Sequence, residues 1–272
     1  MKKFVWVLII IFITIWAIST LFPMYWMFQT AFTPEEEIST FPPKLFPSHL
    51  TLQNFSELFQ SSLIWKWIVN SLIISISITV LSLLVCSMAA YAFSKLQFPG
   101  KNWMFTAIVA TILVPAQVTL LPTFLIVSKM NLIDTLWAII IPSIASPYTI
   151  FMIRQYMLSI PTDFIDAARI DGAAEFTIYW KIILPMSKPV LAASAIFTFI
   201  SSWNGFLWPL IVLNSAEKYP LTVGLATLQR QHLVQYGLQM AGATISALPM
   251  IVIFFAFQKY FMRGLMSGGT KG

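Results

Sequence analysis

Ionisable side chains gather in one stretch of this chain, residues 163–188, which reads DFIDAARIDGAAEFTIYWKIILPMSK. No other stretch of comparable length holds as many, and the set consists of Asp163, Asp166, Arg169, Asp171, Glu175, Lys181 and Lys188. Carboxylates and cations interspersed at this density can form polar contacts across an interface with a second protein. We call residues 163–188 the charged segment and predict that it is a docking surface.

The rest of the sequence offers no pattern for catalysis or metal binding. It contains no G-x-x-x-x-G-K-[ST] phosphate loop and no paired carboxylates or Ser/His/Asp set placed for catalysis. His49 and His232 lack a Cys, Asp or Glu at metal-ligand spacing. The single cysteine, Cys86, lies in an apolar run, where a buried small side chain is expected. We therefore predict a non-catalytic chain that holds neither a metal nor a cofactor of its own.

Lipid is the predicted solvent for most of the chain. Of its 272 residues, 58% are hydrophobic and 10% are charged, a balance far from that of soluble domains. Six stretches free of Asp, Glu, Lys and Arg reach the length of roughly 20 residues that a bilayer requires. They are residues 4–34, 67–94, 102–128, 136–153, 189–216 and 231–258. Because none alternates like a barrel strand, we predict an all-α polytopic membrane protein with six transmembrane helices.

Local signals refine these spans. The fourth is the shortest, so its helix is expected either to continue over Gln155 to Met157 or to stand nearly upright in the bilayer. Pro115 and Pro122 fall inside the third and would bend or break it. Whether such kinks mark moving parts or ordinary packing irregularities stays open at this point. Pro99 and Gly100 predict a tight turn between the second and third spans.

The distribution of Lys and Arg predicts the orientation. The first apolar run follows Met1-Lys2-Lys3 but exceeds a signal h-region and lacks a convincing cleavage site, so a retained anchor is favoured over a cleaved signal peptide. With a cytosolic N-terminus, most of the 16 Lys and Arg residues lie inside. The outer ones are Lys44, Lys66, Lys129, Lys218 and Arg230. Both termini and the charged segment are then cytosolic, and anionic lipid rather than nucleic acid explains the basic balance.

The first external segment, residues 33–60, is rich in proline and mildly acidic. Its end predicts a short amphipathic helix, because Asn54, Phe55, Leu58 and Phe59 recur at helical spacing. Two interpretations remain for this segment, a solvated connector and a loop that contacts a partner.

Two short helices with a bend between them are predicted for the charged segment. Thr162 is the expected N-cap of the first, and Gly172 interrupts it after about two turns. An apolar second part then ends at Pro185, and Pro189 opens the next span.

On the first of these helices, Ala167 and Ala168 would let another surface approach closely, with Asp166, Arg169 and Asp171 supplying polar contacts around them. An amphipathic loop lying on the inner leaflet is the alternative interpretation.

The same residues resemble a known motif. Asp166-Ala167-Ala168, Gly172 and Ile182-x-Leu184-Pro185 have the spacing of the EAA loop (E-A-A-x3-G-x9-I-x-L-P) of binding-protein-dependent ABC importer permeases. The stretches YAFSKLQFPGKN, LIDTLWAIIIPSIASPYTIFMIRQYMLSIP, SKPVLAASAIFTFISSWNGFLWPLIVL and RGLMSGGTKG are similar to the second permease of maltose-type carbohydrate importers. The likeness spans residues 68–272, and the first helix and external loop, 1–67, fit the same single transmembrane domain. The chain departs at Asp166, where Glu is usual, and at Gly205, where relatives often have Asp.

This resemblance implies an assembly. The chain would pair with a homologous second permease, with two cytosolic subunits that bind ATP and Mg²⁺, and with an extracytoplasmic solute-binding protein, in a bacterial-type plasma (inner) membrane. The charged segment would be the coupling helix seated in the ATPase. Its contact residues would be Asp166, Ala167, Ala168, Arg169, Asp171, Gly172, Ile182, Leu184 and Pro185. The tail from Arg263 would approach the ATPase, and the loop near Ser215 to Gln231 would meet the solute-binding protein.

For the translocation path we predict Asn204 with Trp203 and Trp208, since amides and aromatic faces suit sugars. Alternatively, Trp208 is an interfacial belt residue and Asn204 an interhelical hydrogen bond. A self-sufficient secondary carrier or channel is the competing function. The predicted spans contain none of the mid-membrane charges that ion-coupled carriers use, which favours the importer. Import of glycerol phosphate by the same architecture also remains open.

Overall fold

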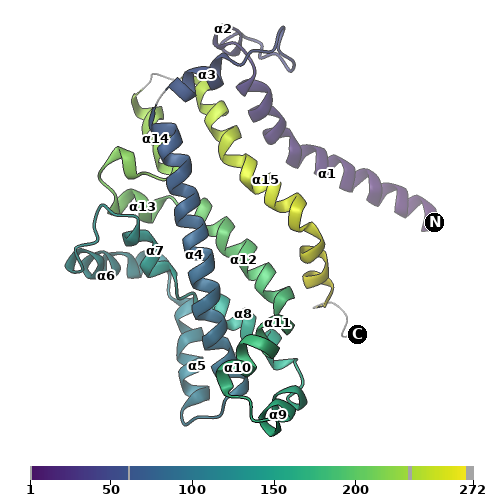
Figure 1. Cartoon of the computed structure of the whole chain (residues 1–272). Coiled ribbons are helices and arrows are strands. Elements are labelled where there is room, and N and C mark those ends of the chain that lie inside the picture. Colours follow the sequence, from purple (N-terminus) through teal and green to yellow (C-terminus); the bar gives the residue numbers. More distant parts are fainter. Residues whose placement is uncertain (1, 61, 232–234, 268–272) are drawn as a thin grey trace. The chain divides into compact units, whose positions relative to one another are not determined.

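A computed structural model of the protein describes residues 2–60, 62–231 and 235–267. Within these ranges the regular secondary structure is entirely helical (Figure 1). The chain divides into two compact units, Met1–Trp65 with Gly224–Ile251, and Lys66–Val223 with Val252–Gly272. The predicted all-α fold is confirmed.

The first unit is built on two long apolar helices, α1 (Lys2–Ala31) and the start of α15 (Tyr236–Ser267). It also holds α2 (Glu35–Ile38), α3 (Gln53–Gln60) and the end of α14 (Leu221–Gln231). The predicted amphipathic helix is α3. Its buried Asn54 donates hydrogen bonds to the carbonyl oxygens of Ala31 at 3.0 Å and Thr33 at 2.9 Å, so α3 ties down the end of α1.

In the second unit, α4 (Ser62–Lys95) is the longest helix and continues along the chain into α5 (Lys101–Ala110) through the predicted turn at Pro99 and Gly100. Then follow η1 (Thr111–Leu113), α6 (Ala116–Lys129), α7 (Trp137–Ser143) and α8 (Pro147–Leu158). The charged segment comprises α9 (Asp163–Ile170), α10 (Glu175–Ile178), a π-helical turn η2 (Tyr179–Ile183) and α11 (Leu184–Met186). The unit continues with α12 (Lys188–Trp203), α13 (Leu207–Val212) and η3 (Ala216–Lys218).

Four helices are long and apolar enough to cross a membrane, Lys3–Ala31, Leu63–Lys95, Trp137–Leu158 and Tyr236–Phe257. Two bent pairs, Lys101–Leu113 with Ala116–Lys129 and Glu175–Met186 with Lys188–Trp203, raise the number to six if each pair is one span. These counts refer to the described residues. The predicted multi-pass architecture is therefore supported. The first bent pair covers the third predicted span, whereas the second joins the end of the charged segment to α12 at the start of the fifth.

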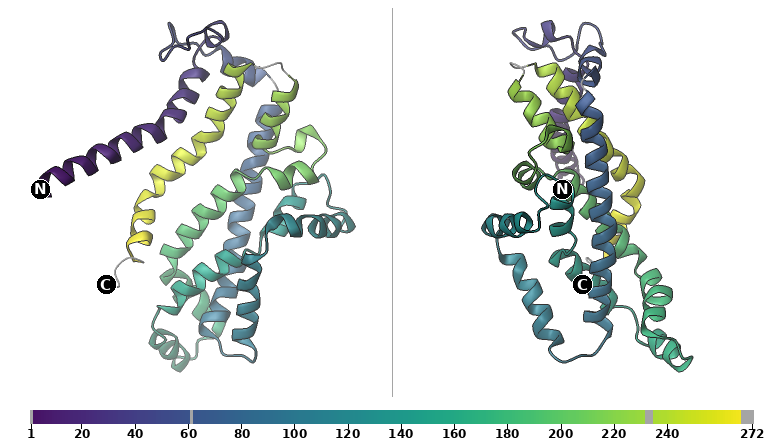
Figure 2. Two further views of the ribbon diagram at one scale, coloured as in Figure 1. Left: turned by 180° about the vertical axis from the view of Figure 1, so that it is seen from behind. Right: turned by 60° about the vertical axis from the view of Figure 1, so that its left-hand side comes forward.

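The third predicted span does not form one helix. Its halves meet at 106°, and Figure 2 shows α6 turned away from the direction of α5. Pro115 causes the break, because it lacks an N–H donor and holds Val114 in an extended conformation. Pro122 lies inside α6 without ending it, so only the first of these prolines interrupts the helix.

The fifth predicted run, 189–216, is also interrupted. Helix α12 ends at Trp203, and residues 204–206 separate it from α13. Two features disfavour continuation of the helix. Gly205 has a low helix propensity, and Pro209 cannot donate to the carbonyl of Gly205. The fourth run extends to Leu158 as expected, although Ser146 starts a new helix within it by accepting a hydrogen bond from the N–H of Thr149 at 3.3 Å.

Two apolar clusters hold the second unit together. One joins the end of α4 to α8, α9 and η2, and includes the predicted buried Cys86. The other joins the middle of α4 to α6, α7 and α13. The first cluster positions the charged segment, since Ile165 of α9 and Ile183 of η2 are fully buried in it. Burial of each such side chain contributes about 1.5–3 kcal/mol.

Candidate functional site

The charged segment bends at Gly172, after its first helix, as the sequence predicts. Helix α9 ends at Ile170, and Gly172 has a φ of +80°, a conformation that L side chains adopt only at a cost. The N–H groups of Gly172 and Ala173 donate to the carbonyls of Arg169 at 3.0 Å and Ala168 at 2.9 Å, which closes the end of the helix. A glycine here lets α9 end and the chain reverse direction.

Thr162 does not cap α9 as expected. Its backbone already has helical angles, φ −71° and ψ −21°, and its side chain accepts no hydrogen bond from the helix. The carbonyl of Thr162 instead accepts from the N–H groups of Ile165 and Asp166 at 2.8 and 3.0 Å. The predicted start of the helix is right, but the predicted capping contact is wrong, because a hydroxyl cap requires a non-helical residue at this position.

Ala167 and Ala168 lie on different faces of α9. Ala168 is buried with Ile165 in the apolar cluster, whereas Ala167 is exposed beside Asp166. Asp163, Asp166 and Asp171 are likewise exposed. The small size of Ala168 lets α9 lie close to its own core, so the surface open to a partner is formed by Ala167 and the surrounding carboxylates.

An ion-pair network that the sequence did not reveal anchors this surface. The Arg169 guanidinium lies 2.7 Å from the Glu175 carboxylate and 3.5 Å from that of Asp166. The other Glu175 oxygen accepts a hydrogen bond of 2.6 Å from the hydroxyl of Tyr91 on α4. The Glu175 carboxylate raises the pKa of Arg169, which keeps this cation charged. The network links α9 through Glu175 to the long helix α4.

The apolar half of the charged segment packs inward. Tyr179 is buried, and its hydroxyl lies 2.7 Å from that of Ser87 on α4. Ile182 and Leu184 are half-buried against the same cluster, and Pro185 is exposed. This part continues to Met186 rather than ending at Pro185, and a 78° bend then leads into α12, where Pro189 occupies the first turn as predicted.

A cavity of about 490 Å³ lies in the second unit. Helices α4, α7, α8, α12 and α13 contribute to it. Its hydroxyl-bearing side chains are Ser143, Ser146, Tyr148, Thr149, Thr198, Ser201 and Ser202, and its large apolar ones are Ile78, Ile139, Phe197 and Trp208. All of its lining residues are described, and none is Asp, Glu, Lys, Arg or His. We call it the hydroxyl cavity.

Several of its hydroxyls are available to a ligand. Those of Tyr148, Thr198, Ser201 and Ser202 make no hydrogen bond within the described part of the chain, so each can donate and accept. Trp208, which also lines the cavity, is held in place because its indole N–H donates to the carbonyl of Ala138 at 3.0 Å. The cavity thus combines adaptable polar groups with a rigid aromatic wall.

Of the three predicted pathway residues, only Trp208 lines this cavity. Trp203 is buried and stacks on Phe199 at 5.9 Å between ring centroids. Asn204 is exposed, and its amide donates to the carbonyl of Ile200 at 3.0 Å at the end of α12. Contact of these two residues with cargo stays a prediction. The spacing of Thr198, Ser201 and Ser202, on one face of a helix, was the signal that could have identified the lining.

A polar clamp fixes the loop after α13. The Asp134 carboxylate accepts hydrogen bonds from the N–H groups of Asn214 and Ser215, both at 2.9 Å, and from the Lys218 ammonium at 2.8 Å. These donors hold the pKa of Asp134 well below its usual range, with the Lys218 contact first among them. The indole of Trp67 donates to the carbonyl of Ala216 at 2.7 Å. The start of the predicted binding-protein loop, 215–231, is therefore tied to the second unit.

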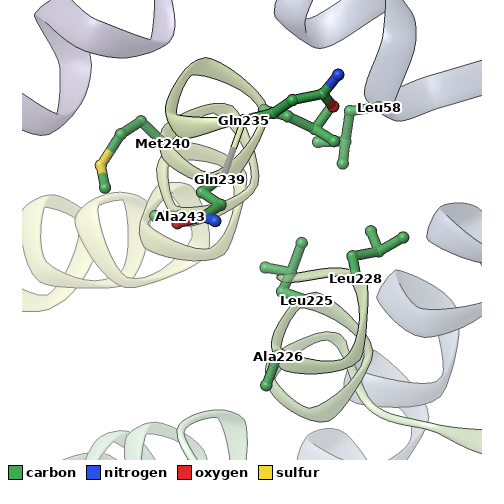
Figure 3. A pocket seen from close by; sticks show the side chains of 9 residues that line it. Leu58, Leu225, Ala226, Leu228, Gln235, Gln239, Met240 and Ala243 are labelled. Atoms are coloured by element: carbon green, nitrogen blue, oxygen red, sulfur yellow. The ribbon is translucent and has the colours of Figure 1, made fainter. Parts of the chain in front are cut away.

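A separate pocket of about 370 Å³ belongs to the first unit. Figure 3 shows Leu225 and Leu228 of α14 on one side, with Gln235 and Gln239 on another. It is mostly apolar, and the predicted lone His232 lies outside the described residues. Among described residues, no group of three His, Cys, Asp or Glu side chains could hold a metal ion. The tail from residue 268 and the side chains from 258 onward also lie outside the description.

Comparison with known proteins decides the family. The sequence profile of the family described as "Binding-protein-dependent transport system inner membrane component" matches residues 82–267. The chain belongs to this family. The predicted family is thereby confirmed, as is its location as an inner-membrane transport component.

Related proteins and a solved structure are similar to this chain over almost its whole length. The chain is 41% identical to the arabinooligosaccharides transport system permease protein AraQ of Halalkalibacterium halodurans, over 98% of this chain and 96% of that one. It is 30% identical to the sn-glycerol-3-phosphate transport system permease protein UgpE of Yersinia pestis, over 94% of each. It superposes with a TM-score of 0.89 on a chain of a bacterial ABC transporter involved in the import of the acidic polysaccharide alginate. That match has 26% identity and covers 96% of this chain and 97% of the other. These relatives are permeases, so the chain is a permease subunit of an ABC transport system.

Proposed function

We propose that the chain is the membrane-spanning permease subunit of an ATP-driven importer of uncharged oligosaccharides. It forms half of the translocation path with a homologous permease. Two cytosolic subunits bind and hydrolyse ATP with Mg²⁺, and an extracytoplasmic solute-binding protein delivers the cargo. The chain itself holds neither cofactor nor catalytic group. Family membership and the carbohydrate-transporting relatives support this assignment.

The hydroxyl cavity is the observation that carries the choice of cargo. A sugar presents hydroxyl groups and apolar C–H faces, which match free Ser, Thr and Tyr hydroxyls beside Trp208 and Phe197. A phosphate or uronate group would instead require a cation to replace its hydration, and the cavity lining supplies none. We therefore favour a neutral cargo over the charged cargoes named for the more distant relatives.

We propose that the charged segment couples this path to ATP hydrolysis. Asp166, Ala167, Asp171 and Gly172 are exposed and would contact the ATPase subunit. Inward-packed residues such as Ala168, Ile182 and Leu184 would transmit its movement to the membrane helices. The contacts from Arg169 through Glu175 to Tyr91 form a direct polar link to α4.

The topology that we propose places both termini and the charged segment in the cytosol and residues 215–231 outside. One transmembrane domain then comprises residues 1–272, with a first helix and external loop over 1–67. Cysteine-accessibility labelling at exposed Asp171 and Lys129 would test it, since the two sites must react from opposite sides of the membrane.

Reconstitution tests the whole assignment. The complete importer, with its partner permease, ATPase subunits and binding protein, is placed in proteoliposomes and given labelled arabinotriose or labelled glycerol 3-phosphate. We expect ATP-dependent uptake of arabinotriose and negligible uptake of glycerol 3-phosphate. Preferential uptake of the phosphate would refute the neutral cargo, and uptake by this chain alone without ATP would establish a secondary carrier instead.

A further inference from the structure

A polar recess of about 460 Å³ lies where α4 turns into α5. Gln97, Lys101, Asn102, Trp103 and Arg154 contribute side chains to its wall. The last of these comes from α8, 53 residues after Lys101 in the chain, so that the fold alone brings the two cations together. The recess shares no lining residue with the hydroxyl cavity.

Both cations are held in place by backbone oxygens. The Lys101 ammonium donates to the carbonyl of Leu96 at 2.7 Å, and the Arg154 Nε donates to that of Phe93 at 2.9 Å. The guanidinium also lies 3.9 Å from the centroid of the Phe105 ring. These contacts fix the positions of the charges without neutralising them, because the carbonyls are dipoles rather than anions.

Within the described residues, no carboxylate forms an ion pair with Lys101 or Arg154. Every ion pair within residues 2–60, 62–231 and 235–267 involves other cations, namely Lys44, Lys66, Arg169 and Lys218. Lys95 adds a third positive charge nearby, bound to the carbonyl of Ile160 at 2.5 Å. Fixed like charges in one recess repel each other, so an anion with several acceptor oxygens would relieve the repulsion.

The location of the recess identifies the source of that anion. Lys95 and Lys101 bound two apolar candidate membrane helices, so the recess lies at the ends of these helices. A bilayer spanned by them would place its headgroups at this level. Trp103 at its rim is 76% exposed, and tryptophan concentrates at the membrane–water interface. Basic pockets in this position between membrane helices recognise phospholipid headgroups.

We propose that this recess binds the headgroup phosphate of an anionic phospholipid, with Lys101 and Arg154 as the cationic ligands and Gln97 and Asn102 as neutral donors. The site is independent of the cargo and of the proposed topology, since it requires only that the α4–α5 turn lies at a membrane surface. Its occupation would fix the ends of three membrane helices relative to the lipid.

Tryptophan quenching in the complete importer tests the proposal. The complex is placed in nanodiscs of phosphatidylcholine that contain either brominated phosphatidylglycerol or brominated phosphatidylcholine. The difference between the parent and Trp103→Phe isolates the emission of Trp103. We expect phosphatidylglycerol to be preferred beside Trp103, and each removed cation to lower the preference about fivefold. Lys101→Gln therefore lowers it, and Lys101→Gln with Arg154→Gln abolishes it.

Two control variants and a fallback complete the test. Lys129→Gln removes an exposed cation distant in sequence from the recess and should leave the preference unchanged. Arg154→Lys keeps the charge and should retain most of it. If Arg154→Gln does not assemble, Lys101→Gln alone gives the same test. Equal quenching by the two lipids in the parent would overturn the proposal, and so would displacement of phosphatidylglycerol by millimolar inorganic phosphate, which would indicate a site for soluble anions.

Discussion

The charged segment and the hydroxyl cavity lie in the same unit and use opposite chemistry. The segment exposes carboxylates and connects to α4 through an arginine, a glutamate and a tyrosine. The cavity has hydroxyls and aromatic rings in its lining and no ionisable Asp, Glu, Lys, Arg or His. A coupling contact must survive repeated force, which favours charge-assisted bonds, whereas cargo must leave after it binds, which favours many weak contacts. With the roles that we propose for the two regions, the segment would make strong contacts with the ATPase and the cavity reversible contacts with cargo.

A charge placed in the hydroxyl cavity is expected to have the largest effect on transport. In Ser202→Lys, a cation enters a lining without an acidic partner, and burying such a charge costs several kcal/mol. We expect uptake of neutral sugar in the reconstituted importer to fall at least about 100-fold, on the scale of about 1.4 kcal/mol per tenfold. Basal ATPase activity should persist, because the charged segment is unchanged. The matched control, Ser202→Ala, removes a single weak contact and should lower uptake only about fivefold. Similar losses in both variants would contradict the role of charge.

Gly172 provides the next largest effect. Gly172→Ala and Gly172→Leu share the same backbone strain at φ +80°, and nothing lies within 4 Å of the added Cβ in this chain. They differ in the bulk presented to a partner. We expect Gly172→Leu to lower uptake about thirtyfold below Gly172→Ala if a close-packed contact is lost, which corresponds to about 2 kcal/mol. Membrane insertion, measured by the yield of assembled complex, should be the same for Gly172→Ala and Gly172→Leu. Equal uptake in the two variants would indicate that only strain matters.

The contact between Glu175 and Tyr91 tests the role of the charged segment. A charge-assisted hydrogen bond contributes about 1.5–3 kcal/mol and the neutral bond that Gln can still make about 0.5–1.5 kcal/mol. The difference of about 1 kcal/mol means that Glu175→Gln should lower the sugar transported per ATP hydrolysed about three- to tenfold. Tyr91→Phe removes the same bond from α4. In a double-mutant cycle, the two substitutions together should then cost little more than either one. Additive losses would show that Glu175 and Tyr91 act separately.

The smallest predicted effect is the pH dependence of the polar clamp formed by Asp134. Because the pKa of this carboxyl is held below its ordinary value, the clamp is fully present above an unfolded pKa of about 3.9 and is lost as pH falls through the lower folded value. We expect protection of the amides of Asn214 and Ser215, measured by hydrogen exchange and corrected for intrinsic rates, to stay constant from about pH 5 to pH 8. Asp134→Asn should lower it throughout that range. A protection step near neutral pH in the parent would assign the clamp to another group.

Sequence reasoning reached the elements whose causes are local. Apolar runs gave the membrane helices, Pro99 and Gly100 gave the turn before α5, and Gly172 gave the end of α9. Each follows from backbone freedom or from the hydrophobicity of consecutive residues. The spacing from Asp166 to Pro185 also indicated the family that the comparison establishes.

Errors arose where local rules compete. Pro115 breaks the third span and Pro122 does not, although both lack an N–H. Thr162 stands in the expected place but already has helical backbone angles, so its side chain cannot cap. The run of residues 189–216 is apolar enough for one helix, yet helix α12 ends at Trp203. In each case the outcome depends on the backbone conformation at particular residues, which a count of apolar residues does not contain.

That the protein is a helical membrane permease with one dense group of charged residues follows from its sequence, because composition and motif spacing are properties of the chain. Which side chains meet depends on the fold. Glu175 joins Tyr91 across 84 residues, and the helical phase of α12 directs Ser201 and Ser202 into the cavity lining. The same packing buries Ala168 and leaves Ala167 exposed. Contacts between distant segments depend on the direction in which each helix leaves its bend, and that direction is set by the folded core.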